Sequence, residues 1–333
     1  MLIINDKSLQ ILRYYYIVMN DRLDKIKEYV NDVAYNVKND FSLNLDEIIE
    51  SEFEKAFEIL EEIIEYIKRK YGIDYKIPEL KMVEDGHSYI GEYSEIENKI
   101  SFFKKSIKRE INRQLGFLNH KEEIKRLIYE ELKSLGYTGS ISDIQGRGIE
   151  YLYVTRNEIF LYPSYINKGD IIEAIARAFI RFIMFHEIWH SIDNSIMDKL
   201  IEDSTIKGRY YLLTILKNRE LRASAFQVVM YYLANGLHKD VRGYIAAYVN
   251  IPLCRNFIEK IDIMKKGSIK MKLNIPYELG LCYGNIIVAK YRSSLEENID
   301  KIIDDLVYLD EKRAIEAIRY YGDNPDKLLD NRI

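Results

Sequence analysis

The sequence predicts a mainly helical α+β protein, in which a small antiparallel sheet packs on a central helix and helices extend the fold at both ends. Three observations support this class. Long segments repeat apolar residues at helical spacing, two short segments have the pattern of hairpins, and one helical segment is apolar on almost every side. Of the 333 residues, 47% are hydrophobic and 31% are charged, as in folded globular proteins.

The first part of the chain, about residues 7–71, has the apolar spacing of helices. The segment LDEIIESEFEKAFEILEEIIEYIKRKYG repeats apolar residues at helical intervals and stops at Gly72. Pro78 then marks a break. From about residue 88 the period changes, because SYIGEYSEIENKISFF alternates around a turn near Glu97 and Asn98. This pattern predicts a hairpin.

The middle of the chain begins with a second helical block, KKSIKREINRQLGFLNHKEEIKRLIYEELKSLG, which ends at Gly136 and is followed by a loop. IEYLYVTRNEIFLYPSYI then predicts a second hairpin. The next helix, DIIEAIARAFIRFIMFHEIWHSIDNSI, is apolar almost all round, so we expect it to be central and buried. We divide the chain into an N-terminal helical region (1–82), a core with inserted helices (83–250) and a C-terminal helical region (251–333).

Charge and cysteine content exclude several classes of protein. The net charge of −4 gives no broad surface for nucleic acid. The N-terminus is a poor signal peptide and no apolar stretch is long enough to span a bilayer, so we expect no membrane partner and a cytoplasmic location. Cys254 and Cys282 have no zinc-knuckle spacing, and a single disulfide between them stays open.

The sequence HEIWH at 186–190 carries the strongest chemical signal in the chain. On a helix His190 lies about 40° from His186 and one turn further along, so both imidazoles can bind one ion. Glu187 lies about 100° round, at the flank of that face. Two histidines with an adjacent carboxylate are what zinc-dependent hydrolysis requires, and we expect one zinc ion per chain.

A catalytic zinc ion usually has a third protein ligand, for which Glu220 is the best candidate. It follows His190 at a distance that leaves room for a loop and a returning helix, on which Glu220, Ala223, Ser224 and Gln227 share one face. The competing candidates are Asp193, Glu202 and Asp203. Asp193 also falls on the ligand face, where it could instead accept a hydrogen bond from His190.

HEIWH at 186–190 followed by ELRASAF at 220–226 resembles the gluzincin class of zinc metallopeptidases, above all the archaeal minigluzincins and the ImmA/IrrE-like peptidases. The resemblance covers about residues 150–235. It implies zinc on His186, His190 and Glu220, with Glu187 as the general base. It also implies that an antiparallel strand lines the cleft and pairs with an extended peptide, and residues 158–166 stand where that strand is expected. Residues 83–250 are then a gluzincin-like catalytic core.

Hydrolysis also needs a group that stabilises the oxyanion, and tyrosine or histidine usually serves. We select Tyr277, in the first turn of a predicted helix, and His238; Tyr231 and Tyr232 are further candidates. Gly280 and Gly284 would let that helix approach its neighbour closely.

The predicted function is therefore a zinc metallopeptidase that hydrolyses peptide bonds of a peptide or protein substrate through a zinc-bound water activated by Glu187. The alternative is a non-catalytic regulatory or interaction protein that retains such a zinc core as a scaffold. The sequence does not indicate an oligomeric state.

Overall fold

The computed structural model describes residues 43–84, 89–119, 121–134, 139–143, 151–154, 159–162, 171–265 and 275–328. These residues form a mainly helical α+β fold, which confirms the predicted class. The helices and strands are α2 (Leu45–Tyr71), β1 (Glu79–Val83), β2 (Gly91–Ser94), β3 (Lys99–Phe103), α3 (Lys104–Asn119), α4 (Lys121–Ser134), β4 (Tyr151–Val154), β5 (Ile159–Tyr162), α5 (Ile171–Glu202), α6 (Ile206–Leu216), α7 (Arg219–Ala234), α8 (Val241–Lys265), α9 (Ile275–Tyr291), α10 (Ile299–Val307) and α11 (Glu311–Asp323). The helices predicted before residue 43 lie outside the described residues.

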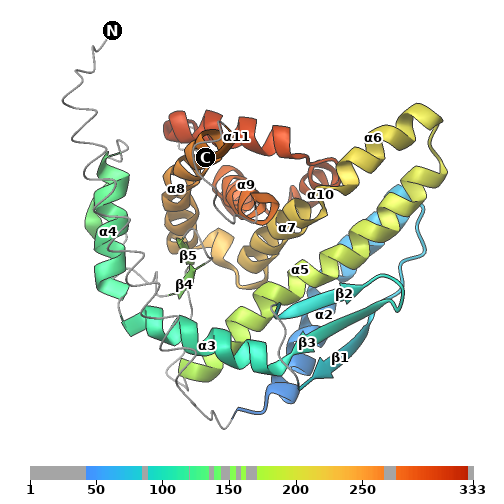
Figure 1. The fold of residues 1–333 in the computed structure, drawn as a ribbon, viewed down its shortest axis with the longest axis horizontal. Coiled ribbons are helices and arrows are strands. Elements are labelled where there is room, and N and C mark those ends of the chain that lie inside the picture. The colour runs from blue at the N-terminus through green and yellow to red at the C-terminus, as the bar shows by residue number, and fades with distance from the viewer. Residues whose placement is uncertain are drawn as a thin grey trace.

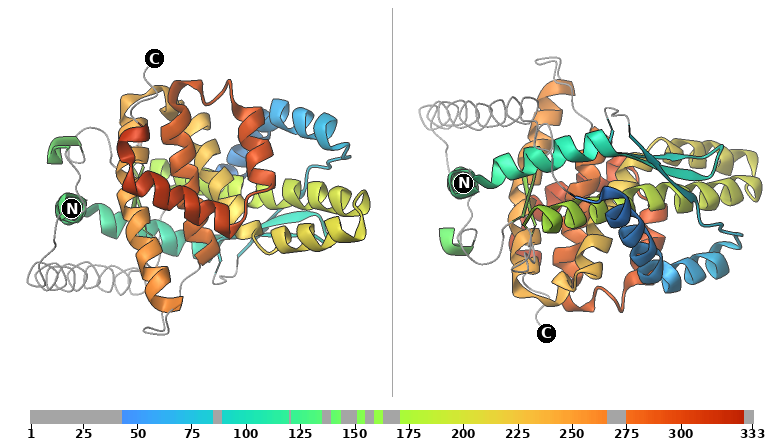
Figure 2. Two further views of the ribbon diagram at one scale, coloured as in Figure 1. Left: turned by 90° about the horizontal axis from the view of Figure 1, so that it is seen from above. Right: turned by 90° about the horizontal axis from the view of Figure 1, so that it is seen from below.

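The long helix α5 runs through the middle of the fold (Figure 1). It packs against α7 on one side and against α2, α3 and β2 on the other. In the view from above the red and orange helices near the C-terminus lie in front of α5, and in the view from below α2 and the sheet lie in front of it (Figure 2). Nearly every residue of α5 between Ile175 and Met197 is buried or partly buried. The all-round apolar character of this helix therefore reflects its central position, as predicted.

The three-stranded sheet has the order β1–β3–β2. The predicted hairpin forms, since β2 and β3 pair antiparallel from Gly91↔Phe102 to Ser94↔Lys99, and Asn98 has a positive φ of 46° in the turn. The small sheet was predicted to be antiparallel, but it is mixed, because β1 pairs parallel with β3. Pro78 marked a break in the sequence, and β1 begins directly after it.

Among the described strands, β2 packs on α5, whereas a strand of residues 158–166 was expected beside this helix. Within that segment the structure describes β5, which pairs antiparallel with β4. β5 packs on α8, and β2 packs on α5. The described strand that packs on the histidine-bearing helix therefore comes from the first hairpin, and the assignment of a cleft strand stays a prediction.

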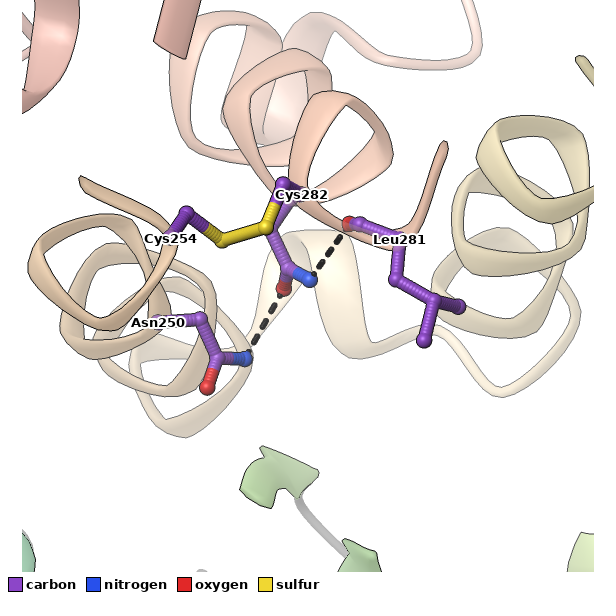
Figure 3. The surroundings of a disulfide bond; sticks show 5 residues. Asn250, Cys254, Leu281 and Cys282 are labelled. Carbon is purple, nitrogen blue, oxygen red and sulfur yellow. Dashed lines mark hydrogen bonds between the residues drawn. A yellow bond between two sulfur atoms is a disulfide. The ribbon is translucent and has the colours of Figure 1, made fainter. Parts of the chain in front are cut away.

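Two contacts hold α9 close to its neighbours. A Cβ added at Gly280 would lie 2.3 Å from the Leu221 carbonyl oxygen, and one at Gly284 would lie 2.6 Å from Val228 Cβ, so α9 nests against α7 as the glycine spacing predicted. On its other side α9 is joined to α8 by the Cys254–Cys282 disulfide, beside which the Asn250 amide donates to Asn285 (Figure 3). The disulfide left open by the sequence is thus present.

One continuous hydrophobic core runs through the described residues, from Leu45 in α2 to Leu328 near the C-terminus. The Asp304 carboxylate of α10 accepts hydrogen bonds from Tyr66, Lys70 and Tyr71 of α2, which ties the two predicted terminal regions together. The division at residues 82 and 250 stays a prediction. None of the helices in the described part combines the length and apolar character needed to cross a bilayer. The cytoplasmic location also stays a prediction.

Candidate metal centre

The two motif histidines lie side by side at the middle of α5. His186 is 6% exposed and His190 is 8% exposed, one helical turn apart. Their Nε2 atoms are 3.1 Å from each other and their rings meet edge to face, with centroids 4.7 Å apart. Both rings therefore direct Nε2 to one point, as the four-residue spacing predicted.

Glu220 in the first turn of α7 completes the group. Its Oε2 lies 3.4 Å from His186 Nε2 and its Oε1 lies 3.4 Å from His190 Nε2. The ligand atoms of the three side chains all lie within 4.8 Å of one another, so they could hold a metal ion. The Glu220 side chain is 44% exposed, which leaves the group open to solvent on this side.

The other candidates for the third ligand do not reach the histidines. Glu202 is the last residue of α5, which places its backbone about 18 Å along the helix from His190. Asp203 follows it and pairs with Lys199 at 3.1 Å. Both residues are exposed. Among the residues that the structure describes, no further His, Cys, Asp or Glu joins the group of three.

Asp193 has a different role from the one considered for it. Its two carboxylate oxygens accept hydrogen bonds from Arg222 Nε at 2.8 Å and Nη2 at 2.6 Å, so it pairs with Arg222 and not with His190. Both side chains are almost completely buried, and Arg222 Nη1 also donates to the Ile215 carbonyl at 2.5 Å. Since Arg222 lies two residues after Glu220, this ion pair fixes where α7 presents Glu220 to α5.

Glu187 is buried on the flank of the histidine face, where β2 covers it. A Cβ added at Gly91 would be 3.0 Å from Glu187 Cγ, so only glycine lets the strand approach this closely. The backbone of Tyr93, two residues along β2, lies close enough to the Glu187 carboxylate to act against the rise in its pKa. This role of β2 was not predicted from the sequence. The signal available was Gly91, a glycine inside a predicted strand, which marks a close approach of another group.

The ionisable side chains in the centre shift one another's pKa values. Burial raises the pKa of Glu187, although the neighbouring imidazoles act against this shift. Burial would also raise the pKa of Glu220, but hydrogen bonds to His186 and His190 hold that pKa well below its usual range. Burial disfavours charged His186, yet Glu220, Glu187 and the Gln227 amide together raise its pKa. Glu187 thus has an environment that favours holding a proton, and Glu220 one that favours staying ionised.

Tyr277, one of the two residues selected for the oxyanion, lies beside the centre. Its ring centroid is 5.5 Å from that of His186, and the rings are tilted at 53°. Tyr277, Gly280 and Gly284 lie on one face of α9, so the close packing of α9 on α7 brings Tyr277 to the histidines.

His238, the other residue selected for the oxyanion, does not lie in the centre. Its Nδ1 is 3.3 Å from the Tyr232 carbonyl oxygen, and its Nε2 is 3.5 Å from Glu296 Oε1. Tyr232 lies about 18 Å along α7 from Glu220. Tyr231 and Tyr232 are buried further along the same helix.

No family model, no curated protein and no solved structure matches this chain.

Proposed function

We propose that the chain is a zinc metallopeptidase of the gluzincin type, which hydrolyses peptide bonds of a peptide or protein substrate. His186, His190 and Glu220 would hold the zinc ion. Two imidazole nitrogens and a carboxylate oxygen are a usual ligand set for catalytic zinc. Tetrahedral ligands at about 2.0–2.1 Å from zinc lie roughly 3.3–3.4 Å from one another. The two Nε2 atoms are 3.1 Å apart, and each lies 3.4 Å from the nearer of the two Glu220 oxygens, which is close to this value.

The residues around the ligands have separate tasks. A zinc ion would supply Lewis acidity, which lowers the pKa of water and polarises a carbonyl group. Glu187 accepts a proton from the attacking water and later delivers it to the leaving amine. Burial raises the pKa of Glu187, a direction that favours uptake of this proton. The close approach of β2 at Gly91 restricts the positions open to the Glu187 side chain.

Tyr277 is the proposed donor to the oxyanion that develops on the substrate carbonyl. Its position beside His186 supports this role, whereas the contacts of His238 do not. β2 is an edge strand of its sheet and lies against Glu187. An extended peptide in the cleft could therefore lie next to β2, which takes the place first considered for residues 158–166.

The observation that carries the proposal is the position of Glu187. A metal site that only braced a scaffold would need the three ligands, but it would have no use for a buried carboxylate beside them. Burial of the Glu187 carboxylate raises its pKa and destabilises the fold. A scaffold would have no reason to retain such a residue. The ligand count also favours an enzyme, since catalytic zinc has three protein ligands and one open position.

The proposal is tested by metal analysis together with cleavage of a mixed peptide pool. The wild type should purify with one zinc ion per chain and cut peptides, and His186→Ala and His190→Ala should lose both properties. Full zinc occupancy in the double variant would show that the ion lies elsewhere. A zinc-loaded wild type that cuts no peptide or protein would favour the scaffold reading.

A further inference from the structure

His186 and Gln227 carry buried polar atoms that have no hydrogen-bond partner. His186 Nδ1, Gln227 Oε1 and Gln227 Nε2 are all buried and lack a partner within hydrogen-bond distance. The Gln227 side chain is completely buried in α7. Buried polar groups are nearly always paired, and an unpaired amide costs free energy. These three atoms therefore call for an explanation in terms of each other or of the metal centre.

The packing of α5 on α7 places the two residues opposite each other. The two helices are antiparallel, because the residues that contact each other run in opposite order along α5 and α7. Asp193 pairs with Arg222, the Trp189 ring lies 4.4 Å from Phe226, and the Phe182 ring lies 5.4 Å from Tyr231. In this register His186 lies between Trp189 and Phe182 on α5, while Gln227 lies between Phe226 and Tyr231 on α7.

The orientation of the His186 ring fixes which atom faces Gln227. Nε2 points to His190 and Glu220, at 3.1 and 3.4 Å, so Nδ1 is directed away from the ligand point. The Gln227 amide is among the groups that raise the pKa of His186, so it lies near the ring although its atoms form no hydrogen bond there. Gln227 and Glu220 are two helical turns apart on one face of α7, so α7 can contact both nitrogens of the same ring.

We propose that Gln227 is the positioning residue of His186: in the zinc-loaded protein its amide oxygen accepts a hydrogen bond from Nδ1–H and so holds the Nε2 lone pair toward the metal. This inference rests on the proposed zinc site. A neutral imidazole carries its proton on one nitrogen only, so an acceptor at Nδ1 selects the tautomer that can bind metal through Nε2. Helix α7 would thereby orient two ligands, since it carries Glu220 itself and Gln227, which orients His186.

The experiment measures zinc affinity by competition with a chromophoric chelator, in the wild type, Gln227→Leu and Gln227→Glu. Leucine has a similar volume but no acceptor, so Gln227→Leu should raise the zinc dissociation constant about 10- to 100-fold. Glutamate keeps an acceptor, so Gln227→Glu should bind zinc far more tightly than Gln227→Leu. Gln114→Leu is the matched control, because Gln114 is a buried glutamine of α3 that donates to Glu110 at 2.6 Å. It should leave zinc affinity unchanged.

Stability separates positioning from packing. Gln227→Leu should not lower the unfolding midpoint of the metal-free protein, because the amide has no partner there. Gln114→Leu should lower that midpoint, because it removes a hydrogen bond already made. Ring ¹⁵N NMR of the zinc-loaded wild type adds a readout that needs no variant, and it should find the His186 proton on Nδ1, protected from exchange.

Three results would overturn the inference: equal zinc affinity in Gln227→Leu and the wild type, equally weak binding in Gln227→Glu and Gln227→Leu, or a His186 Nδ1 without a proton. None of these readouts depends on peptide cleavage. If the wild type binds no zinc at all, the proposed function and this inference fail together. If the wild type binds zinc and only the Gln227 results disagree, the proposed function stands.

Discussion

Arg222 donates two hydrogen bonds to Asp193, at 2.8 and 2.6 Å, across the interface between α7 and α5. The pair lies within one turn of each of two proposed ligands, His190 on α5 and Glu220 on α7. Because both side chains are fully buried, neither charge can turn to water if the other is removed. The ion pair therefore holds the two ligand-bearing helices in register.

Asp193→Asn should destabilise the protein by about 3–5 kcal/mol, since it leaves the Arg222 charge buried without its counterion. Denaturant unfolding of the metal-free protein measures this loss. Asp203→Asn is the control, as Asp203 makes an exposed pair with Lys199 and should change stability by about 0.5 kcal/mol or less. Equal stability of the two variants would show that the buried pair does not brace the helices.

Glu220→Gln should weaken zinc binding on the order of 10-fold or more, because a neutral amide replaces a charged ligand. Glu202→Gln and Asp203→Asn should bind zinc as the wild type does, because neither side chain approaches the histidines. Chelator competition measures all three. A zinc-bound crystal structure with the Glu220 carboxylate turned to solvent would end the assignment.

Tyr277→Phe should keep the zinc ion and the ring contact with His186 but lose the hydroxyl donor. Removal of one oxyanion donor typically lowers kcat by about 100- to 1,000-fold. His238→Gln tests the residue that the structure places elsewhere, and it should leave kcat unchanged. Steady-state kinetics on a cleaved peptide compares the two variants, and the opposite order of effects would restore His238 as the donor.

Reduction of the Cys254–Cys282 disulfide should lower the free energy of unfolding by about 3–4 kcal/mol, as the bond closes a loop across a sequence separation of 28 residues. Unfolding with and without reductant measures the difference, and a double Cys→Ala variant should not respond to reductant. Two free thiols titrated in the denatured, unreduced protein would contradict the pairing.

The parts of the site that were predictable from sequence are those set by helical spacing. His186 and His190 share a face because one helical turn separates them, and the same period placed Glu220 and Gln227 together on α7. It also placed Gly280 and Gly284 on the face of α9 that meets α7. Asp193 also lies on the ligand face by helical spacing. Its carboxylate instead pairs with the buried Arg222 of α7, and no local sequence pattern predicts that partner.

The sheet was harder to predict because strand partners are chosen over long sequence distances. Two segments had hairpin patterns, and alternation alone does not tell which hairpin packs on α5. β1 was missed because it follows Pro78 directly and pairs in parallel with a strand that is not its neighbour in sequence. His238 was selected for its chemistry and its nearness to the ligand helix in sequence, but α7 is long enough to carry its far end away from the centre.

The most direct test of the whole account is the effect of Glu187→Gln on zinc content and on cleavage of a peptide pool, measured on the same preparations. Glu187 lies beside the ligands but is not one of them, so the variant should fold and keep its zinc ion. The amide cannot accept the proton of water, so turnover should fall by about 100- to 10,000-fold. Equal cleavage by wild type and variant, at equal zinc content, would show that Glu187 is not the base and would contradict the proposed mechanism.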